Sequence, residues 1–79
     1  MVNQEKCEEY FDAEEFEKAI ACFDQLLSDD PDNIELIYGK ASALLENEEF
    51  ERAVISFDQI LLFDDRNVNA THDKGAALL

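Results

Sequence analysis

The sequence repeats itself after 34 residues. Residues 14–30 and 48–64 are identical at ten of seventeen positions, so that "EEFEKAIACFDQLL" returns as "EEFERAVISFDQIL". The same offset relates residues 33–45 to 67–79, which share five of thirteen positions. Self-similarity at such a period is typical of proteins whose units stack on one another. The 79 residues are therefore predicted to form one domain, with repeats at 1–33 and 34–67 and a partial third repeat at 68–79.

Each repeat reads as two helices, because its apolar residues recur at steps of three and four. In the second repeat one apolar stripe spans residues 36–45, the polar stretch "ENEE" interrupts it, and another stripe spans residues 50–61. Asn33 and Asn67 stand just before such stripes, in the position of a helix N-cap. With two glycines and one proline in the chain, the prediction is an all-α fold of five helices joined by short turns.

A 34-residue pair of helices with alanine, phenylalanine four residues later and proline eight residues after that resembles the tetratricopeptide repeat. The matching residues are Ala19, Phe23 and Pro31 in the first copy, and Ala53 and Phe57 in the second, where Asp65 stands in place of the proline. The resemblance covers the whole chain. It implies a right-handed superhelical stack of antiparallel helix hairpins, an α-solenoid, in which Phe23 and Phe57 pack against the first helix of the next repeat.

Other positions of the family pattern are kept only in part. The small residue of the first helix falls on Cys7, Ala41 and Gly75, and the tyrosine position on Tyr10, Leu44 and Leu78. Glu14 and Glu48 replace the glycine that is common in the turn between the helices. The resemblance implies that the small residues let the second helix of each repeat approach closely.

The net charge is −14, from twenty acidic and six basic residues. Nucleic acid and anionic membrane surfaces are poor ligands for such a chain, because both need a basic surface. No apolar run approaches the length of a membrane span, and the N-terminus lacks a signal-peptide pattern. These features predict a cytoplasmic protein, in which Cys7 and Cys22 are expected to be reduced rather than bridged.

No residue pattern predicts catalysis, a metal or another cofactor. Cys7 and Cys22 are interpreted as packing residues, since the single histidine, His72, leaves no Cys/His spacing for zinc. The glutamates of "EEFE" and its second copy are expected in the first turn of a helix, where they favour the helix dipole. The acidic stretches after Asp30 and Asp65 lack the glycine and glutamate of a calcium loop. The chain is therefore predicted not to be an enzyme.

In tetratricopeptide arrays the first helices line a concave surface that binds an extended peptide or a helix. The resemblance assigns this groove to Gln4, Glu8, Phe11, Asp12, Glu35, Tyr38, Ser42, Leu45, Glu46, Asn69, His72, Ala76 and Leu79. Members that bind acidic chaperone tails use basic residues there, whereas this set has four carboxylates and no lysine or arginine. A basic or amphipathic protein segment is the predicted partner, with Phe11 and Tyr38 as anchors. Alternatively, these acids only solvate an exposed face.

A second interpretation is structural. About three repeats are usually needed for a stable stack, and its ends are normally capped. Gly75 and Leu78 fall on positions where a following helix is expected to pack. Either the chain is a fragment of a longer array, or another copy covers this face, which would make Gly75 and Leu78 a self-association site in a homo-oligomer.

Overall fold

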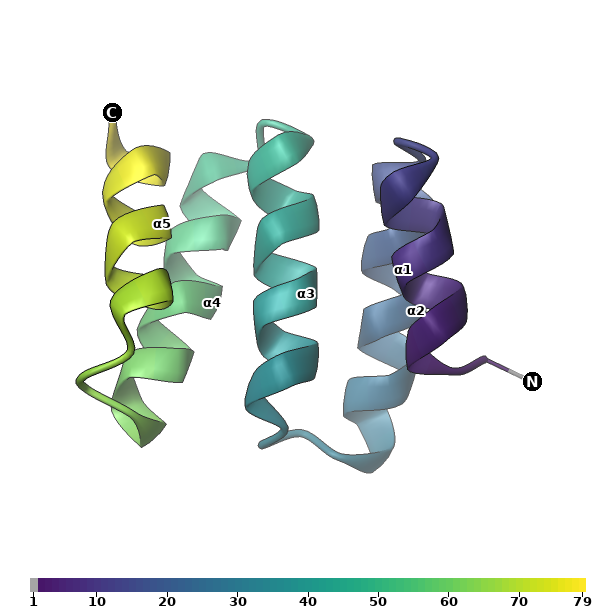
Figure 1. Ribbon diagram of the computed structural model, residues 1–79, viewed down its shortest axis with the longest axis horizontal. Helices are drawn as coiled ribbons and strands as arrows, with labels where there is room; N and C mark the ends of the chain where they lie inside the picture. Colours follow the sequence, from purple (N-terminus) through teal and green to yellow (C-terminus); the bar gives the residue numbers. More distant parts are fainter. Residues whose placement is uncertain (1) are drawn as a thin grey trace.

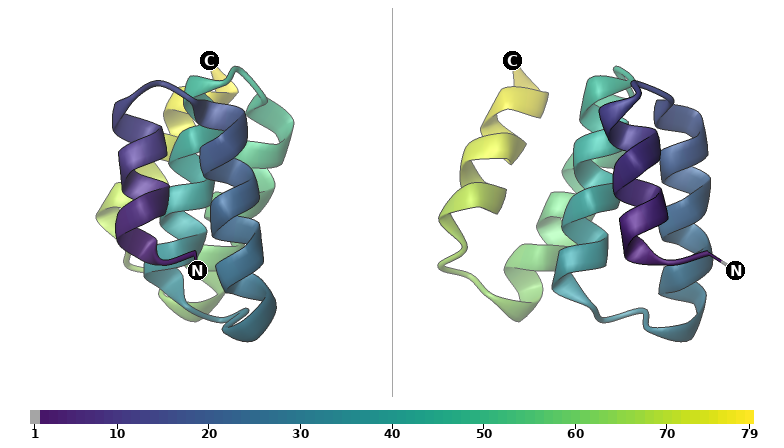
Figure 2. Two further views of the ribbon diagram at one scale, coloured as in Figure 1. Left: turned by 90° about the vertical axis from the view of Figure 1, so that its right-hand side faces the viewer. Right: turned by 45° about the vertical axis from the view of Figure 1, so that its right-hand side comes forward.

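The structure, a computed structural model, describes residues 2–79 and contains five α-helices. They are α1 (Gln4–Asp12), α2 (Phe16–Asp29), α3 (Ile34–Glu46), α4 (Phe50–Phe63) and α5 (Val68–Leu78). Each helix packs antiparallel against the next, with α1, α3 and α5 in one layer and α2 and α4 in the other (Figures 1 and 2). No strand occurs within residues 2–79, and the predicted all-α fold of five helices is confirmed.

The first helix of each unit begins in the same way. Asn3, Asn33 and Asn67 each accept a hydrogen bond on the side-chain oxygen from the backbone N–H three residues further on, at 2.8, 3.2 and 2.9 Å. These bonds satisfy donors that the helix itself leaves unpaired. The N-cap predictions for Asn33 and Asn67 are therefore confirmed, and Asn3 has the same role.

The turns between the paired helices depart from the prediction. Glu14 and Glu48 adopt φ angles of 60° and 61°, in the left-handed region, and Glu15 and Glu49 are the N-cap residues of α2 and α4. The prediction that the glutamates at 14 and 48 lie in a helical turn is wrong. Each ends the preceding helix, where a left-handed residue turns the chain. This backbone conformation explains why glycine is common at this position of the family.

The core lies between the two layers of helices, and large apolar side chains pack where successive units meet. Ala19 and Ala53 are completely buried at the helix crossings, as is the ring of Phe57. Phe23 is buried against α3, where a Cβ added to Gly39 would lie 2.4 Å from the ring. The expected packing of Phe23 against the next unit is confirmed.

The lysines that recur every 34 residues join successive units. Lys40 Nζ lies 2.7 Å from Asp24 Oδ1, and Lys74 Nζ lies 2.6 Å from Asp58 Oδ1, so each ion pair links a second helix to the helix that follows it. Lys6 has no preceding unit among the described residues and instead pairs with Glu9 at 3.7 Å. The 34-residue spacing of Lys40 and Lys74 therefore places each lysine where it can pair with an aspartate of the preceding unit.

Cys7 and Cys22 form a disulfide between α1 and α2, with their Cα atoms 5.4 Å apart. The prediction that they are reduced is wrong, because it came from the expected compartment and could not include the contact made by the helix hairpin. Both residues are buried in the core, which agrees with their predicted packing role. Among the helices described, none combines the length and the apolar character that crossing a bilayer requires.

Candidate functional site

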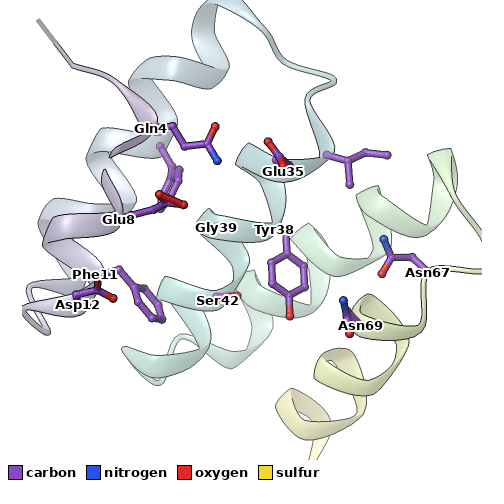
Figure 3. Close-up of a pocket in the computed structure, with 12 residues that line it drawn as sticks. Gln4, Glu8, Phe11, Asp12, Glu35, Tyr38, Gly39, Ser42, Asn67 and Asn69 are labelled. Carbon is purple, nitrogen blue, oxygen red and sulfur yellow. The ribbon is translucent and has the colours of Figure 1, made fainter. Parts of the chain in front are cut away.

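The main concavity is a groove of about 710 Å³ between α1, α3 and the start of α5 (Figure 3). α1 forms one wall, α3 the floor, and the residues that begin α5 the opposite side. The lining residues are Gln4, Glu8, Phe11, Asp12, Phe23, Ile34, Glu35, Tyr38, Gly39, Ser42, Asn67 and Asn69. The volume is in the range of pockets that hold small molecules or a few side chains of a peptide.

The structure brings most of the predicted groove residues together. Gln4, Glu8, Phe11, Asp12, Glu35, Tyr38, Ser42 and Asn69 all line the groove. Leu45 packs partly buried against the core, and Glu46 is exposed at the end of α3. His72 and Ala76 on α5 and Leu79 after it are exposed, and none of them is among the lining residues. Whether the residues in the groove bind a ligand stays a prediction.

Four lining residues were not predicted from the sequence, and Gly39 and Phe23 are the most informative of them. Gly39 lies inside α3, where glycine destabilises a helix. Its missing side chain leaves room for the ring of Phe23, which comes from α2 and reaches the groove floor beneath it. A glycine in the middle of an apolar helical stripe was the available signal for such a close approach. Ile34 and Asn67 complete the set.

Tyr38 joins the groove to α5. Its ring packs edge-to-face on Phe57, with centroids 6.1 Å apart, and its hydroxyl donates a hydrogen bond to the carboxylate of Asp73. Burial, followed by the hydrogen bond to Asp73, raises the pKa of the Tyr38 hydroxyl above its ordinary value. The bond fixes the orientation of the Tyr38 ring, which lies on α3 across the groove from Phe11 on α1 (Figure 3). Asp73 was not among the predicted residues, although it occupies the position of Gly39 in the next unit.

Comparison with known protein families identifies the chain. A family model described as tetratricopeptide repeat matches residues 10–74, which is most of the sequence. The chain belongs to the tetratricopeptide repeat family. Tetratricopeptide repeats are generally protein–protein interaction modules without enzymatic activity. A comparison with curated proteins gives no match.

The groove of this tetratricopeptide repeat domain is acidic at its edges and apolar at its base. Glu8, Asp12 and Glu35 line it, and no lysine or arginine does. Phe11 contributes an aromatic face that packs edge-to-face on Phe16, with centroids 5.4 Å apart. Carboxylates that surround aromatic and aliphatic side chains suit a ligand with a long apolar stem and a positive end.

The tetratricopeptide repeat helices do not assemble a metal-binding cluster within the described part of the chain. No three histidine, cysteine, aspartate or glutamate side chains of residues 2–79 come together in a way that could hold a metal ion. The two cysteines are joined to each other, so neither provides a thiolate while the disulfide is intact.

Proposed function

We propose that the groove binds a basic or amphipathic segment of a partner protein. The observation that carries the proposal is the composition of the lining: three carboxylates, no lysine or arginine, and the rings of Phe11, Phe23 and Tyr38. Lysine and arginine bury their methylene stems on apolar surfaces while their charged ends stay near water or a carboxylate. The groove offers both environments side by side.

The net charge of −14 adds to the attraction of a cationic segment. A field of one sign raises the rate of encounter with an oppositely charged partner, and salt weakens this effect. An acidic segment meets repulsion in the same groove, as do a nucleic acid and an anionic membrane. The acidic charge of the domain therefore favours a basic partner, whereas the anchoring of that partner depends on the aromatic rings in the groove.

Titration with a labelled peptide that alternates arginine and leucine tests this function. Binding is expected to weaken as salt is added, and a peptide with glutamate in place of arginine is expected not to bind. Glu8→Gln should weaken binding more than Glu5→Gln, because Glu8 lines the groove and Glu5, on the same helix, does not. Phe11→Ala should weaken it further by removing an anchor. Absence of salt-sensitive binding, or equal effects at positions 5 and 8, would contradict the proposal.

Self-association through α5 is a second candidate, favoured by a comparison of equivalent positions. Ala41 and Leu44 on α3 are completely buried, whereas a Cβ added at Gly75 would meet no atom within 4 Å and Leu78 is 66% exposed. At the C-terminal end of α4, Leu62 and Phe63 are exposed apolar residues where the first repeat has serine and aspartate. Residues 68–79 hold one acidic and one basic residue, so another copy would meet little repulsion there.

Sedimentation velocity over a range of protein concentrations distinguishes the two functions. Self-association predicts a sedimentation coefficient that rises with concentration and a loss of this rise in Leu78→Asp. The matched control is Ala76→Asp, an exposed position on the same helix. A monomer at every concentration would rule out association through α5 and leave the peptide groove as the one candidate.

A further inference from the structure

The first helices of the two repeats are held in different ways. α3 buries five residues, namely Leu36, Ile37, Ala41, Ala43 and Leu44, whereas α1 buries only Cys7. Tyr10 and Phe11 of α1 are half-buried, and Asn3 and Glu9 stand exposed where α3 has Ile37 and Ala43. α1 has nine residues, and isolated helices of this length are marginal in water. Its position therefore depends on few apolar contacts.

The disulfide stands where apolar packing is weakest. It links Cys7, the one buried residue of α1, to Cys22 in the middle of α2. The equivalent positions of the second repeat are Ala41 and Ser56, and both are buried there without a covalent link. The fold thus accepts small, unlinked residues at these two positions, and the bond is a feature of the first repeat alone.

α1 also supplies one wall of the groove. Gln4, Glu8, Phe11 and Asp12 come from α1, so two of the three lining carboxylates and one aromatic anchor depend on its position. The other groove residues belong to α2, α3 and the start of α5. If α1 moves away from α2, the groove loses this wall while the helices from α2 onward keep their own packing.

We propose that the Cys7–Cys22 disulfide is a redox switch for the groove, an inference that rests on the proposed function. With the bond intact, α1 is held against α2 and the groove is complete. With the bond reduced, α1 separates for much of the time and the affinity for a basic segment falls. In a reducing compartment such as the cytoplasm, which the sequence predicts for this chain, a disulfide of this kind is transient and can act as a regulator.

The chemistry is thiol–disulfide exchange with a dithiol, such as dithiothreitol or the reduced form of a dithiol oxidoreductase. A thiolate of the reductant attacks the Cys22 sulfur, since Cys22 is slightly exposed and Cys7 is completely buried. The S–S bond breaks, and Cys7 leaves as a thiolate that takes up a proton. The second thiol of the reductant then displaces Cys22. Two electrons and two protons pass to the protein, and the reductant becomes a disulfide.

The test compares the oxidised chain, the chain reduced with dithiothreitol, and the double variant Cys7→Ala/Cys22→Ser. This variant copies the residues of the second repeat, so it removes the bond without introducing a residue that the fold does not already contain. Affinity is measured with the labelled arginine–leucine peptide. Hydrogen exchange of the backbone amides in α1 and α3 is measured in parallel, which reports whether α1 alone is released.

Reduction and the double variant should each weaken binding by about tenfold, because a groove that is complete one tenth of the time binds that much less tightly. The amides of α1 should lose protection while those of α3 keep it, and dithiothreitol should not affect the double variant. Unchanged affinity on reduction together with unchanged α1 protection would overturn the switch. Failure of the oxidised chain to bind the peptide would contradict the proposed function. Hydrogen exchange of the α1 amides would then still show whether the Cys7–Cys22 disulfide holds α1 in place. Loss of protection throughout the double variant would indicate unfolding, and the reduced wild-type chain then supplies the comparison.

Discussion

Of four corresponding positions at the two interfaces between successive units, three are occupied by the same residue type and one differs. The first contains Phe23, Asp24, Gly39 and Lys40, and the second contains Phe57, Asp58, Asp73 and Lys74 in the same order. Both have a buried phenylalanine and an ion pair from lysine to aspartate. The glycine of the first interface lets the Phe23 ring reach the groove, whereas Asp73 at the second accepts the hydrogen bond of Tyr38.

This difference shows how one repeated interface can serve two purposes. At the first interface no side chain projects from position 39, and the groove remains open above Phe23. At the second, the Tyr38 ring packs on Phe57, and the Tyr38–Asp73 bond joins α3 to α5. The residues common to both interfaces hold the stack together, and the one that differs determines where a ligand could enter.

The largest expected effect comes from removing the ring at either interface. Phe57→Ala should lower the free energy of unfolding by about 3–5 kcal/mol, because it leaves a cavity in a completely buried site. Phe23→Ala should fall near the lower end of this range, since the groove beside Phe23 can admit water. Urea denaturation measures both, with the exposed Phe50→Ala as control. Equal losses of unfolding free energy in the two variants would mean that the groove beside Phe23 does not lower the cost of removing its ring.

The two glycines should respond oppositely to the same substitution. Gly39→Ala should destabilise by about 1–3 kcal/mol, because its Cβ would lie 2.4 Å from the Phe23 ring and force the ring to move. Gly75→Ala should stabilise by about 0.5–1 kcal/mol, since a Cβ there meets no neighbour and alanine favours the helix. Thermal unfolding of the two variants measures the difference. Stabilisation by both substitutions would show that Gly39 is not needed for close packing.

The bond between Tyr38 and Asp73 is specific to the second interface. Tyr38→Phe should destabilise by about 1–2 kcal/mol, because it leaves the aspartate without its donor. Since burial and the bond raise the pKa of Tyr38, the folded state favours the protonated hydroxyl. That stability is fully present below the ordinary tyrosine pKa of about 10 and is lost as pH rises through the higher folded pKa. Denaturation at neutral and alkaline pH measures this loss, which Tyr38→Phe should reduce. An alkaline transition that is the same in both proteins would contradict the role of the hydroxyl.

The smallest expected effect concerns the ion pairs, which should be alike at the two interfaces. Both are partly exposed, so a double-mutant cycle on Asp24 and Lys40 should give about 0.5 kcal/mol, and the cycle on Asp58 and Lys74 a similar value. High salt should reduce both couplings. A much larger coupling free energy at one interface would show that the two lysine–aspartate pairs are not equivalent, although their positions in the repeat are the same.

Local patterns were sufficient to predict the helices and much of the groove. The three- and four-residue spacing of apolar side chains gives a helix one buried face, and asparagine before a stripe caps its first turn. Eight of the predicted residues line the concavity, because they lie on α1, on α3 and at the start of α5. His72 is exposed on α5 but is not among the residues that line the concavity.

Other features could not be predicted, since they depend on distances between segments. The disulfide requires that Cys7 and Cys22 meet across the α1–α2 hairpin, and the expected compartment argued against it. The Tyr38–Asp73 bond joins residues 35 positions apart. The left-handed turns at Glu14 and Glu48 were hidden because glutamate is unusual in that conformation.

The sequence by itself determined the repeat, the helical class, the positions of the helices and the sign of the charge, because these follow from spacing and composition. The tertiary structure decided which side chains line the groove, which carboxylate holds Tyr38 and which thiols are joined. The physical reason is that the period of a helix places side chains on a face, whereas only the approach of one face to another brings specific atoms into contact. For this tetratricopeptide repeat domain, the groove and the bond that holds its wall are products of that approach.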